Sequence, residues 1–291
     1  TNLEWGERLE KAGVRVHYSL PGVKVHSKLA LVRRVEDGQP HLYAYLGTGN
    51  FHEETAKIYS DFGIFTADPR LTNEVSNVLA HLENMPPPQP FQHLLVGQFN
   101  LRDRLYELIE NEVKAAKKGQ KAEMILKINS LEDKEIIAKL YEASAAGVKI
   151  RLIVRGICCI VPGLKGLSEN IEIISIVDRY LEHARVLVFH NGGDELIFLS
   201  SADWMERNLS FRIETIFPVY DPALRRDIRA ILDIQLHDNV KARIIDAQNL
   251  NEYRRNSSDI PVRTQLETYF YLKRKLEEWK EDVVDSDDEQ G

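Results

Sequence analysis

Two histidines of this chain stand in matching local sequences. His26 is followed two positions later by Lys28 and then by an apolar run, and His183 is followed in the same way by Arg185. Further along each copy, a second apolar run closes on two small residues, a spacer and an amide or carboxylate, here Asn50 or Asp203. Such an internal repeat indicates two similar units that each deliver one histidine to a shared site.

Two histidines beside cations suit transfer of a phosphoryl or phosphodiester group through a covalent intermediate. A neutral imidazole is a good nucleophile near pH 7, because its ordinary pKa is roughly 6.5. A second imidazole can protonate the leaving oxygen. Residues i and i+2 of a strand point to one face, so each ring would lie next to its cation. Lys28 and Arg185 would then stabilise charge on the phosphoryl oxygens, while Asn50 and Asp203 would orient a histidine, contact phosphate or cap a helix.

The bulk composition narrows the classes of function. The chain has 291 residues, of which 43% are hydrophobic and 29% charged, with a net charge of −7. No run approaches the roughly 18 apolar residues of a membrane helix, so no transmembrane segment is expected. The negative charge argues against non-specific nucleic-acid binding, although a polyanion could still bind in a locally basic channel. Cys158 and Cys159 are adjacent, which excludes an ordinary disulfide between them and fits a reducing, cytoplasmic setting.

The prolines at 86–88 mark the clearest break in the chain, because consecutive prolines end helices and stiffen a linker. We predict a first domain over 1–93, a second over 94–282 and a disordered acidic tail over 283–291. Because Thr1 opens inside a helical pattern, we expect a fragment whose first domain is incomplete at its N-terminus. The patterns before the break predict helices at 3–12 and 71–83, a hairpin of 27–34 with 41–47, and strands at 14–19 and 59–65.

After the break, the patterns predict an amphipathic helix over 100–117 and then a strand–helix–strand unit. The unit comprises 123–128, 132–145 and 148–154, with a capping box at Ser130 and Asp133. A helix between two strands favours a parallel pair, so Arg155 falls at the carboxyl edge, where α/β sheets bind ligands. Further strands are expected at 171–177, 185–189, 195–200, 211–217 and 242–245, and further helices at 221–236 and 262–280.

The paired His-x-Lys/Arg units resemble the phospholipase D superfamily, in which each of two halves gives one histidine. The resemblance implies an α/β fold of two phospholipase D-like domains related by a pseudo-repeat. That superfamily has an aspartate five residues beyond each cation, whereas this chain has Arg33 and His190 there. Phosphodiester hydrolysis is therefore the less expected reaction.

A closer resemblance is to the carboxyl-terminal part of type 1 polyphosphate kinases, in order from about residue 1 to about residue 280. The segments that carry it are Pro21–Lys28, Gly47–Phe51, Val154–Gly156, Val177–His183, Asn191–Asp194 and Leu199–Asn208. The resemblance implies reversible transfer of the terminal phosphate of ATP to inorganic polyphosphate, with release of ADP.

The same resemblance implies roles for individual residues. His26 would become phosphorylated, and His183 would act as its acid–base partner beside the nucleotide. Tyr59 and Arg155 would belong to the nucleotide site, although a half-buried strand aromatic is otherwise the commoner reading of Tyr59. The family also implies Mg²⁺, associated with arginines that lie upstream of Thr1.

Members of that family are much longer, so we expect this fragment to hold both histidines in an incomplete site. The full-length protein is expected to be a cytoplasmic homo-oligomer, with membrane association left open. Two alternatives also stay open. One is a phosphodiesterase or nuclease of the phospholipase D type that uses water as the acceptor. The other is an inactive fragment that binds polyphosphate or nucleotide.

Overall fold

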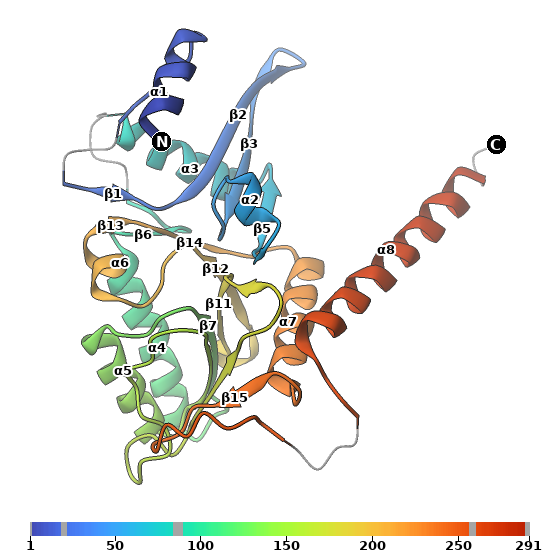
Figure 1. Ribbon diagram of the computed structural model, residues 1–291. Coiled ribbons are helices and arrows are strands. Elements are labelled where there is room, and N and C mark those ends of the chain that lie inside the picture. The colour runs from blue at the N-terminus through green and yellow to red at the C-terminus, as the bar shows by residue number, and fades with distance from the viewer. Residues whose placement is uncertain (1, 19–21, 84–89, 256–259, 289–291) are drawn as a thin grey trace.

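The structure of the chain is a computed structural model, shown in Figure 1, that describes residues 2–18, 22–83, 90–255 and 260–288. The proline break at 86–88 lies outside the described residues. So does Ser19, the last residue of the strand predicted over 14–19.

The first part of the chain forms a small antiparallel sheet with helices around it. Its elements are α1 (Asn2–Lys11), β1 (Lys24–Val25), β2 (Lys28–Glu36), β3 (Gln39–Gly47), α2 (Glu53–Ala56), β4 (Tyr59–Ser60), β5 (Gly63–Thr66) and α3 (Pro69–Leu82). The sheet order is β2-β3-β5. The predicted hairpin is confirmed, and its two-residue turn has positive φ at Asp37 (51°) and Gly38 (75°), as tight hairpin turns require.

Two strand predictions for this part were wrong. Residues 14–18 form no strand, because a strand needs a hydrogen-bonded neighbour and none of the described segments pairs with them. The strand predicted over 59–65 is divided at Asp61 and Phe62, because β4 and β5 pair with different partners. β4 pairs with β10 (Leu181–Glu182), and β5 pairs with β3.

The second part is built on an eight-stranded sheet. Its remaining elements are β6 (Leu95–Val96), α4 (Leu101–Lys117), β7 (Glu123–Ile128), α5 (Lys134–Ala145), β8 (Lys149–Val154), β9 (Ile171–Ile176), β11 (Arg185–Phe189), a 3₁₀ turn (Asn191–Gly193), β12 (Leu196–Ser200), α6 (Glu206–Ser210), β13 (Arg212–Ile213), β14 (Thr215–Pro218), α7 (Pro222–His237), β15 (Ala242–Ile244) and α8 (Thr264–Asp288). The strand order is β15-β9-β8-β7-β11-β12-β14-β6, and β7, β8 and β9 run parallel.

The strand–helix–strand prediction is confirmed, with one correction at the start of its helix. Asp133 itself is the N-cap of α5, and its side chain accepts a hydrogen bond from the backbone N–H of Ile136. Ser130 is therefore not the cap, because the helix begins three residues later than a capping box at Ser130 requires.

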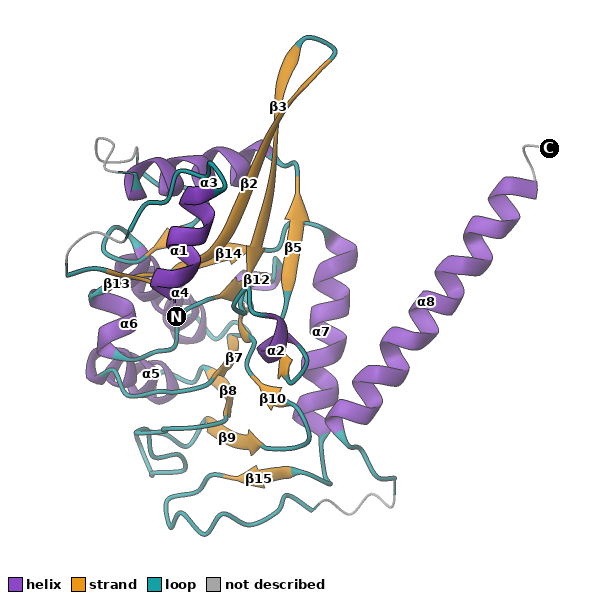
Figure 2. Cartoon of the chain, turned by 45° about the horizontal axis from the view of Figure 1, so that its top comes forward, coloured by secondary structure: helices purple, strands orange, loops and turns teal. Residues whose placement is uncertain are grey.

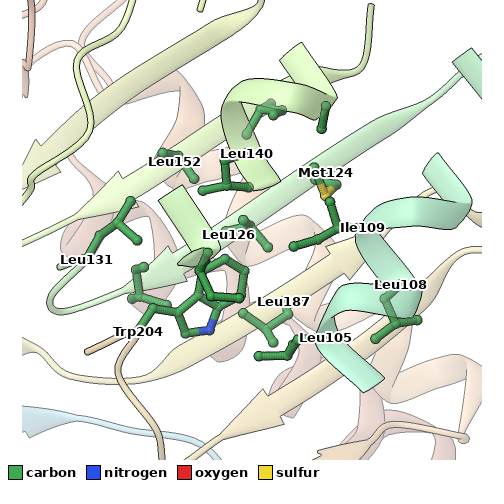
Figure 3. Close-up of a cluster of buried hydrophobic side chains, with 14 of the residues drawn as sticks. Leu105, Leu108, Ile109, Met124, Leu126, Leu131, Leu140, Leu152, Leu187 and Trp204 are labelled. Atoms are coloured by element: carbon green, nitrogen blue, oxygen red, sulfur yellow. The ribbon is translucent and has the colours of Figure 1, made fainter. Parts of the chain in front are cut away.

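Helices α4 and α5 cover one face of the large sheet. Figure 3 shows Leu105 and Ile109 of α4 and Leu140 of α5 pointing toward Leu126 of β7 and toward Trp204, which is fully buried. Apolar residues at helical spacing on α4 and α5 form this contact, and the buried strands β7 and β8 supply its other side.

The opposite face of the sheet joins the two parts of the chain. One hydrophobic cluster contains Leu46 of β3 and Val75 of α3 together with Val186 of β11 and Leu232 of α7. The domain boundary near residue 93 stays a prediction. Whatever its position, the elements on its two sides pack through this common cluster.

The two copies of the sequence repeat form corresponding hairpins, β2–β3 and β11–β12. Lys28 at the start of β2 pairs with Gly47 at the end of β3, and Arg185 at the start of β11 pairs with Ser200 at the end of β12. The equal register shows that the two matching sequences fold into equivalent hairpins.

Helix α8 extends away from the body of the protein, beyond its contact with α7 (Figures 1 and 2). It continues to Asp288, into the segment for which the sequence predicted a disordered acidic tail, since each residue added to an existing helix gains a hydrogen bond. Residues 289–291 lie outside the described part. Within the described residues, no helix combines the length and the apolar character needed to cross a membrane.

Candidate active site

His26 is held by a segment of the second part of the chain. β1 pairs in parallel with β13, and the backbone N–H of His26 donates to the carbonyl oxygen of Ile213 at 2.9 Å. The next residue, Glu214, is fully buried and accepts from His26 Nδ1 at 2.9 Å. The ring of His26 is therefore oriented by a carboxylate 188 residues away in sequence.

His183 is held in the same way by the first part of the chain. β10 pairs in parallel with β4, and the N–H of His183 donates to the carbonyl oxygen of Ser60 at 3.2 Å. The next residue, Asp61, accepts from His183 Nδ1 at 2.8 Å. Each part of the chain thus supplies the carboxylate for the other part's histidine.

A hydroxyl group fixes each of these carboxylates. Thr48 Oγ1 donates to Asp61 at 2.6 Å, and Ser201 Oγ donates to Glu214. In both cases the hydroxyl residue lies 13 positions before the acid. Asp61 and Glu214 were not among the predicted site residues, and their equal spacing after the two matching small-residue turns is the signal that could have identified them.

These carboxylates differ from the aspartates of the phospholipase D signature. The signature positions hold Arg33, which is exposed, and His190, which is half-buried at the end of β11. The site nevertheless contains two carboxylates, contributed by Asp61 and Glu214 from other positions. The absence of the signature aspartates therefore does not leave the histidines without anionic partners.

The hydrogen bonds define one proton position on each ring. A carboxylate can only accept, so Nδ1 of each histidine carries a proton. For His183, Nε2 also accepts from the guanidinium of Arg185 at 3.1 Å. Burial, aided by the charges of Arg185 and Lys28, lowers the pKa of His183 despite the neighbouring Asp61. His183 is therefore neutral at pH 7, and the lone pair of its Nε2 faces the guanidinium of Arg185.

Arg185 contacts residues of both parts of the chain. It makes two hydrogen bonds to Asp203, at 3.1 and 3.0 Å, and it donates to the carbonyl oxygen of His183 at 2.9 Å. Burial would raise the pKa of Asp203, but the charge and hydrogen bonds of Arg185 outweigh it and hold that pKa below its ordinary value. A longer contact of 3.5 Å reaches the carbonyl oxygen of Thr48. Asp203 thus orients the cation rather than a histidine.

Lys28 is the equivalent cation beside His26. It is 4% exposed, and its ammonium donates to the carbonyl oxygen of His26 at 2.6 Å. Burial lowers the pKa of Lys28 to about 8, an effect that Glu214 opposes and Arg185 reinforces. The charges of the two parts therefore act on one another, as expected for a single site. Asn50, the repeat partner of Asp203, is exposed before α2.

The residues predicted for nucleotide binding lie beside His183. The ring of Tyr59 is 4.8 Å from that of His183, with an interplanar angle of 55°. Arg155 follows β8 at the carboxyl edge, as predicted, and its Nε donates to the carbonyl oxygen of Glu182 at 3.0 Å. Burial lowers the pKa of Arg155, and Asp203 and Tyr59 are among the groups that oppose this shift. Tyr59, Arg155 and His183 therefore border one region.

The carboxylates near the two histidines are the possible metal ligands of the site. Among the described residues, no group of three His, Cys, Asp or Glu side chains is placed to hold a metal ion. The nearby carboxylates are already paired: Asp61 with His183, Glu214 with His26, and Asp203 with Arg185. No protein ligand for Mg²⁺ is assigned in this chain.

Comparison with known proteins gives consistent matches along the chain. Residues 1–87 match the family model of polyphosphate kinase C-terminal domain 1, and residues 94–265 match that of polyphosphate kinase C-terminal domain 2. A polyphosphate kinase of Vibrio parahaemolyticus is 49% identical over 288 residues, covering 98% of this chain and 41% of that protein. A polyphosphate kinase of Escherichia coli K12 is 47% identical over 272 residues, covering 94% of this chain and 40% of that protein.

Among solved structures, the crystal structure of polyphosphate kinase from Porphyromonas gingivalis matches with a TM-score of 0.90 and 49% identity. The match covers 95% of this chain and 43% of that chain. This chain therefore spans about two fifths of the length of the curated relatives it matches.

Proposed function

This chain belongs to the polyphosphate kinase family, and from that premise we propose that it carries the histidine chemistry of ATP:polyphosphate phosphotransfer. The observation that supports this most is the reciprocal pairing of His26 with Glu214 and of His183 with Asp61. The pairing directs Nδ1 of both rings to a carboxylate, so Nε2 of His26 is left for the attack, while Nε2 of His183 accepts from Arg185. Because this chain spans about two fifths of the length of its relatives, we assign the activity to the longer protein that would contain it.

In the proposed reaction, Nε2 of His26 attacks the γ-phosphorus of ATP. The N–P bond forms while the bond from phosphorus to the β,γ-bridging oxygen breaks, and ADP leaves with that electron pair. Lys28 and Arg185 supply positive potential for the equatorial oxygens, the principal requirement of this reaction class. A terminal oxygen of polyphosphate then attacks phospho-His26, the N–P bond breaks, and the chain is one phosphate longer.

Glu214 supports the first step by holding the proton on Nδ1. As positive charge develops on the attacking ring, a buried carboxylate hydrogen-bonded to Nδ1 stabilises it. His183 is the proposed acid–base partner: its neutral Nε2, which accepts from Arg185, can act as a base, and it can donate to an oxygen only after it has taken up a proton. Tyr59 supplies a surface for the base of the nucleotide and Arg155 a cation for its phosphates. Magnesium enters only as the usual partner of ATP phosphates.

We also propose a location and an assembly for the full-length protein. We place the reaction in the cytoplasm, where ATP is available, and expect the full-length enzyme to be a homo-oligomer. Gel filtration with light scattering on the full-length protein measures the second point.

The test is labelling of the full-length enzyme with γ-³²P-ATP, followed by acid and alkali treatment of the product. Acid-labile, alkali-stable label that disappears in His26→Ala supports the proposal. Label that persists in His26→Ala removes this residue from the nucleophile role. Hydrolysis of a phosphodiester substrate without ATP would instead favour a phosphodiesterase.

A further inference from the structure

A buried ion pair that the proposed chemistry does not use adjoins His183. Lys127 of β7 and Glu182 of β10 are each 3% exposed, and Lys127 Nζ lies 3.1 Å from Glu182 Oε2. Lys127 also donates to the carbonyl oxygen of Ala184 at 3.3 Å. The lysine therefore contacts the residues on both sides of His183 in sequence.

The carboxylate of Glu182 is the meeting point of three elements. Besides Lys127 of β7, it accepts from Gln235 of α7 at 3.2 Å and from Gln265 of α8 at 2.9 Å. Gln265 also binds the backbone of Tyr180 in both directions, accepting at 2.9 Å and donating at 2.8 Å. The strand that ends at Glu182, directly before His183, is thereby fixed to the large sheet and to both C-terminal helices.

The backbone of this strand is held as well. The carbonyl oxygen of Glu182 accepts from Arg155, and that of His183 accepts from Asn129 Nδ2 at 3.1 Å. Together with Lys127 on Ala184, three successive carbonyl groups each receive a side-chain donor. β10 is outside the large sheet and pairs with β4, so these side-chain donors add to that pairing in fixing its position.

The first part of the chain has no charged residue at the equivalent position beside its histidine. At the position before His26, the repeat has Val25, and β1 pairs with β13 in the same way as β10 pairs with β4. The fold of the repeat therefore does not demand an ion pair here. A buried ion pair is also weak evidence for stability, because apolar replacements are often neutral or stabilising.

We propose that Lys127 and Glu182 are positioning residues that fix His183 for phosphotransfer. They act through the backbone on either side of the ring and touch neither substrate nor reacting atom. This role rests on the proposed function of His183, and it distinguishes His183 from His26, whose ring is set by Glu214 while the adjoining residue is Val25.

The test uses Lys127→Met/Glu182→Gln, which removes both charges and keeps side-chain length. In this chain, ¹⁵N–¹H spectra of the histidine rings are expected to show a shifted or broadened His183 Nδ1–H signal and an unchanged His26 signal. In the full-length enzyme, kcat is expected to fall about 10- to 100-fold, with the KM for ATP unchanged, because small misplacement of a reacting group has effects of this size. Lys127→Arg, which keeps the pair, is expected to retain most of the activity.

The matched control is Glu123→Gln/Arg151→Met, which removes an ion pair at the far end of β7 and should leave both ring signals and kcat unaltered. If the double variant does not fold, Gln265→Ala loosens Glu182 from the half-buried first turn of α8, with an expected loss in kcat of about 2- to 10-fold. An unaltered His183 signal and unaltered kcat in the folded double variant would overturn the proposal. A wild-type enzyme without phosphotransfer would refute the proposed function, while the ring spectra would still decide whether the pair positions His183.

Discussion

Replacing Glu214 by glutamine tests whether this carboxylate sets the tautomer of His26. Glu214 is fully buried, and its Oε2 accepts from both His26 Nδ1 and Ser201 Oγ. Its Oε1 accepts from Asn208 Nδ2 at 2.7 Å. All three neighbours are donors, so the amide NH₂ of a glutamine must displace one of them.

The structure indicates which neighbour gives way. If the glutamine oxygen stays on His26 and Ser201, its NH₂ faces the NH₂ of Asn208. Asn208 Oδ1 is buried and has no hydrogen-bond partner among the described residues. Turning over the Asn208 amide therefore converts a donor–donor conflict into a hydrogen bond and satisfies that oxygen. His26 keeps its Nδ1 proton, and only the negative charge is lost.

The expected cost follows from that difference. A hydrogen bond to a charged group contributes about 1.5–3 kcal/mol and a neutral one about 0.5–1.5 kcal/mol, so the loss is about 1–2 kcal/mol. The rate of His26 phosphorylation should fall about 5- to 30-fold. An enforced wrong tautomer would cost far more, on the order of 10⁴-fold, as in the Ser-His-Asp triad.

The assay is the rate of labelling of the full-length enzyme from γ-³²P-ATP, together with ¹⁵N spectra of the His26 ring in this chain. The control is Glu214→Gln/Asn208→Leu, in which the amide cannot turn over, and it should lose considerably more activity. A Glu214→Gln rate equal to wild type would refute the orienting role of Glu214. A 10⁴-fold loss with the proton on Nε2 would refute the reasoning about Asn208.

Three further predictions concern the cation, the nucleotide and the core. Burial lowers the pKa of Lys28 to about 8 from 10.5, so the folded state binds fewer protons than the unfolded state between these values. The charged lysine thus costs stability below pH 8, on the order of 3 kcal/mol, and the cost vanishes above pH 10.5. Lys28→Met should therefore melt higher than wild type at pH 7, with a gap that closes toward pH 10.5 in thermal unfolding; equal melting at pH 7 contradicts this. Tyr59→Ala should weaken ADP binding to the full-length enzyme by about 1–3 kcal/mol if the ring stacks on the base, with Tyr59→Phe as the near-neutral control in calorimetry. Trp204→Ala should lower the unfolding free energy by about 3–5 kcal/mol in denaturant titrations, since the side chain is fully buried, and a loss below 1 kcal/mol would count against its place in the core.

Local patterns predicted most elements of this fold. The β2–β3 hairpin, the β7–α5–β8 unit and the position of Arg155 follow from alternation, turn residues and helix signals within some 30 residues. The repeat is also the basis of the prediction that His26 and His183 share a site, because both copies have one chemistry at one spacing. These are the features for which neighbouring residues carry the information.

The features that escaped prediction depend on distant partners. Asp61 and Glu214 bind histidines 122 and 188 residues away, and neither acid stands in the matching sequences. The division of the strand predicted over 59–65 has the same origin, since β4 leaves the small sheet to pair with β10. Asp203 was expected to orient a histidine or cap a helix, whereas its carboxylate forms an ion pair with the nearby Arg185.

The exchange of carboxylates has a consequence for biosynthesis. His26 leaves the ribosome 188 residues before Glu214, which at about 5–20 residues per second is a delay of about 10–40 s. Throughout that interval the nascent chain has the imidazole but lacks the group that orients it. The proposed nucleophile therefore acquires its orienting partner only when the later residues have been translated and docked.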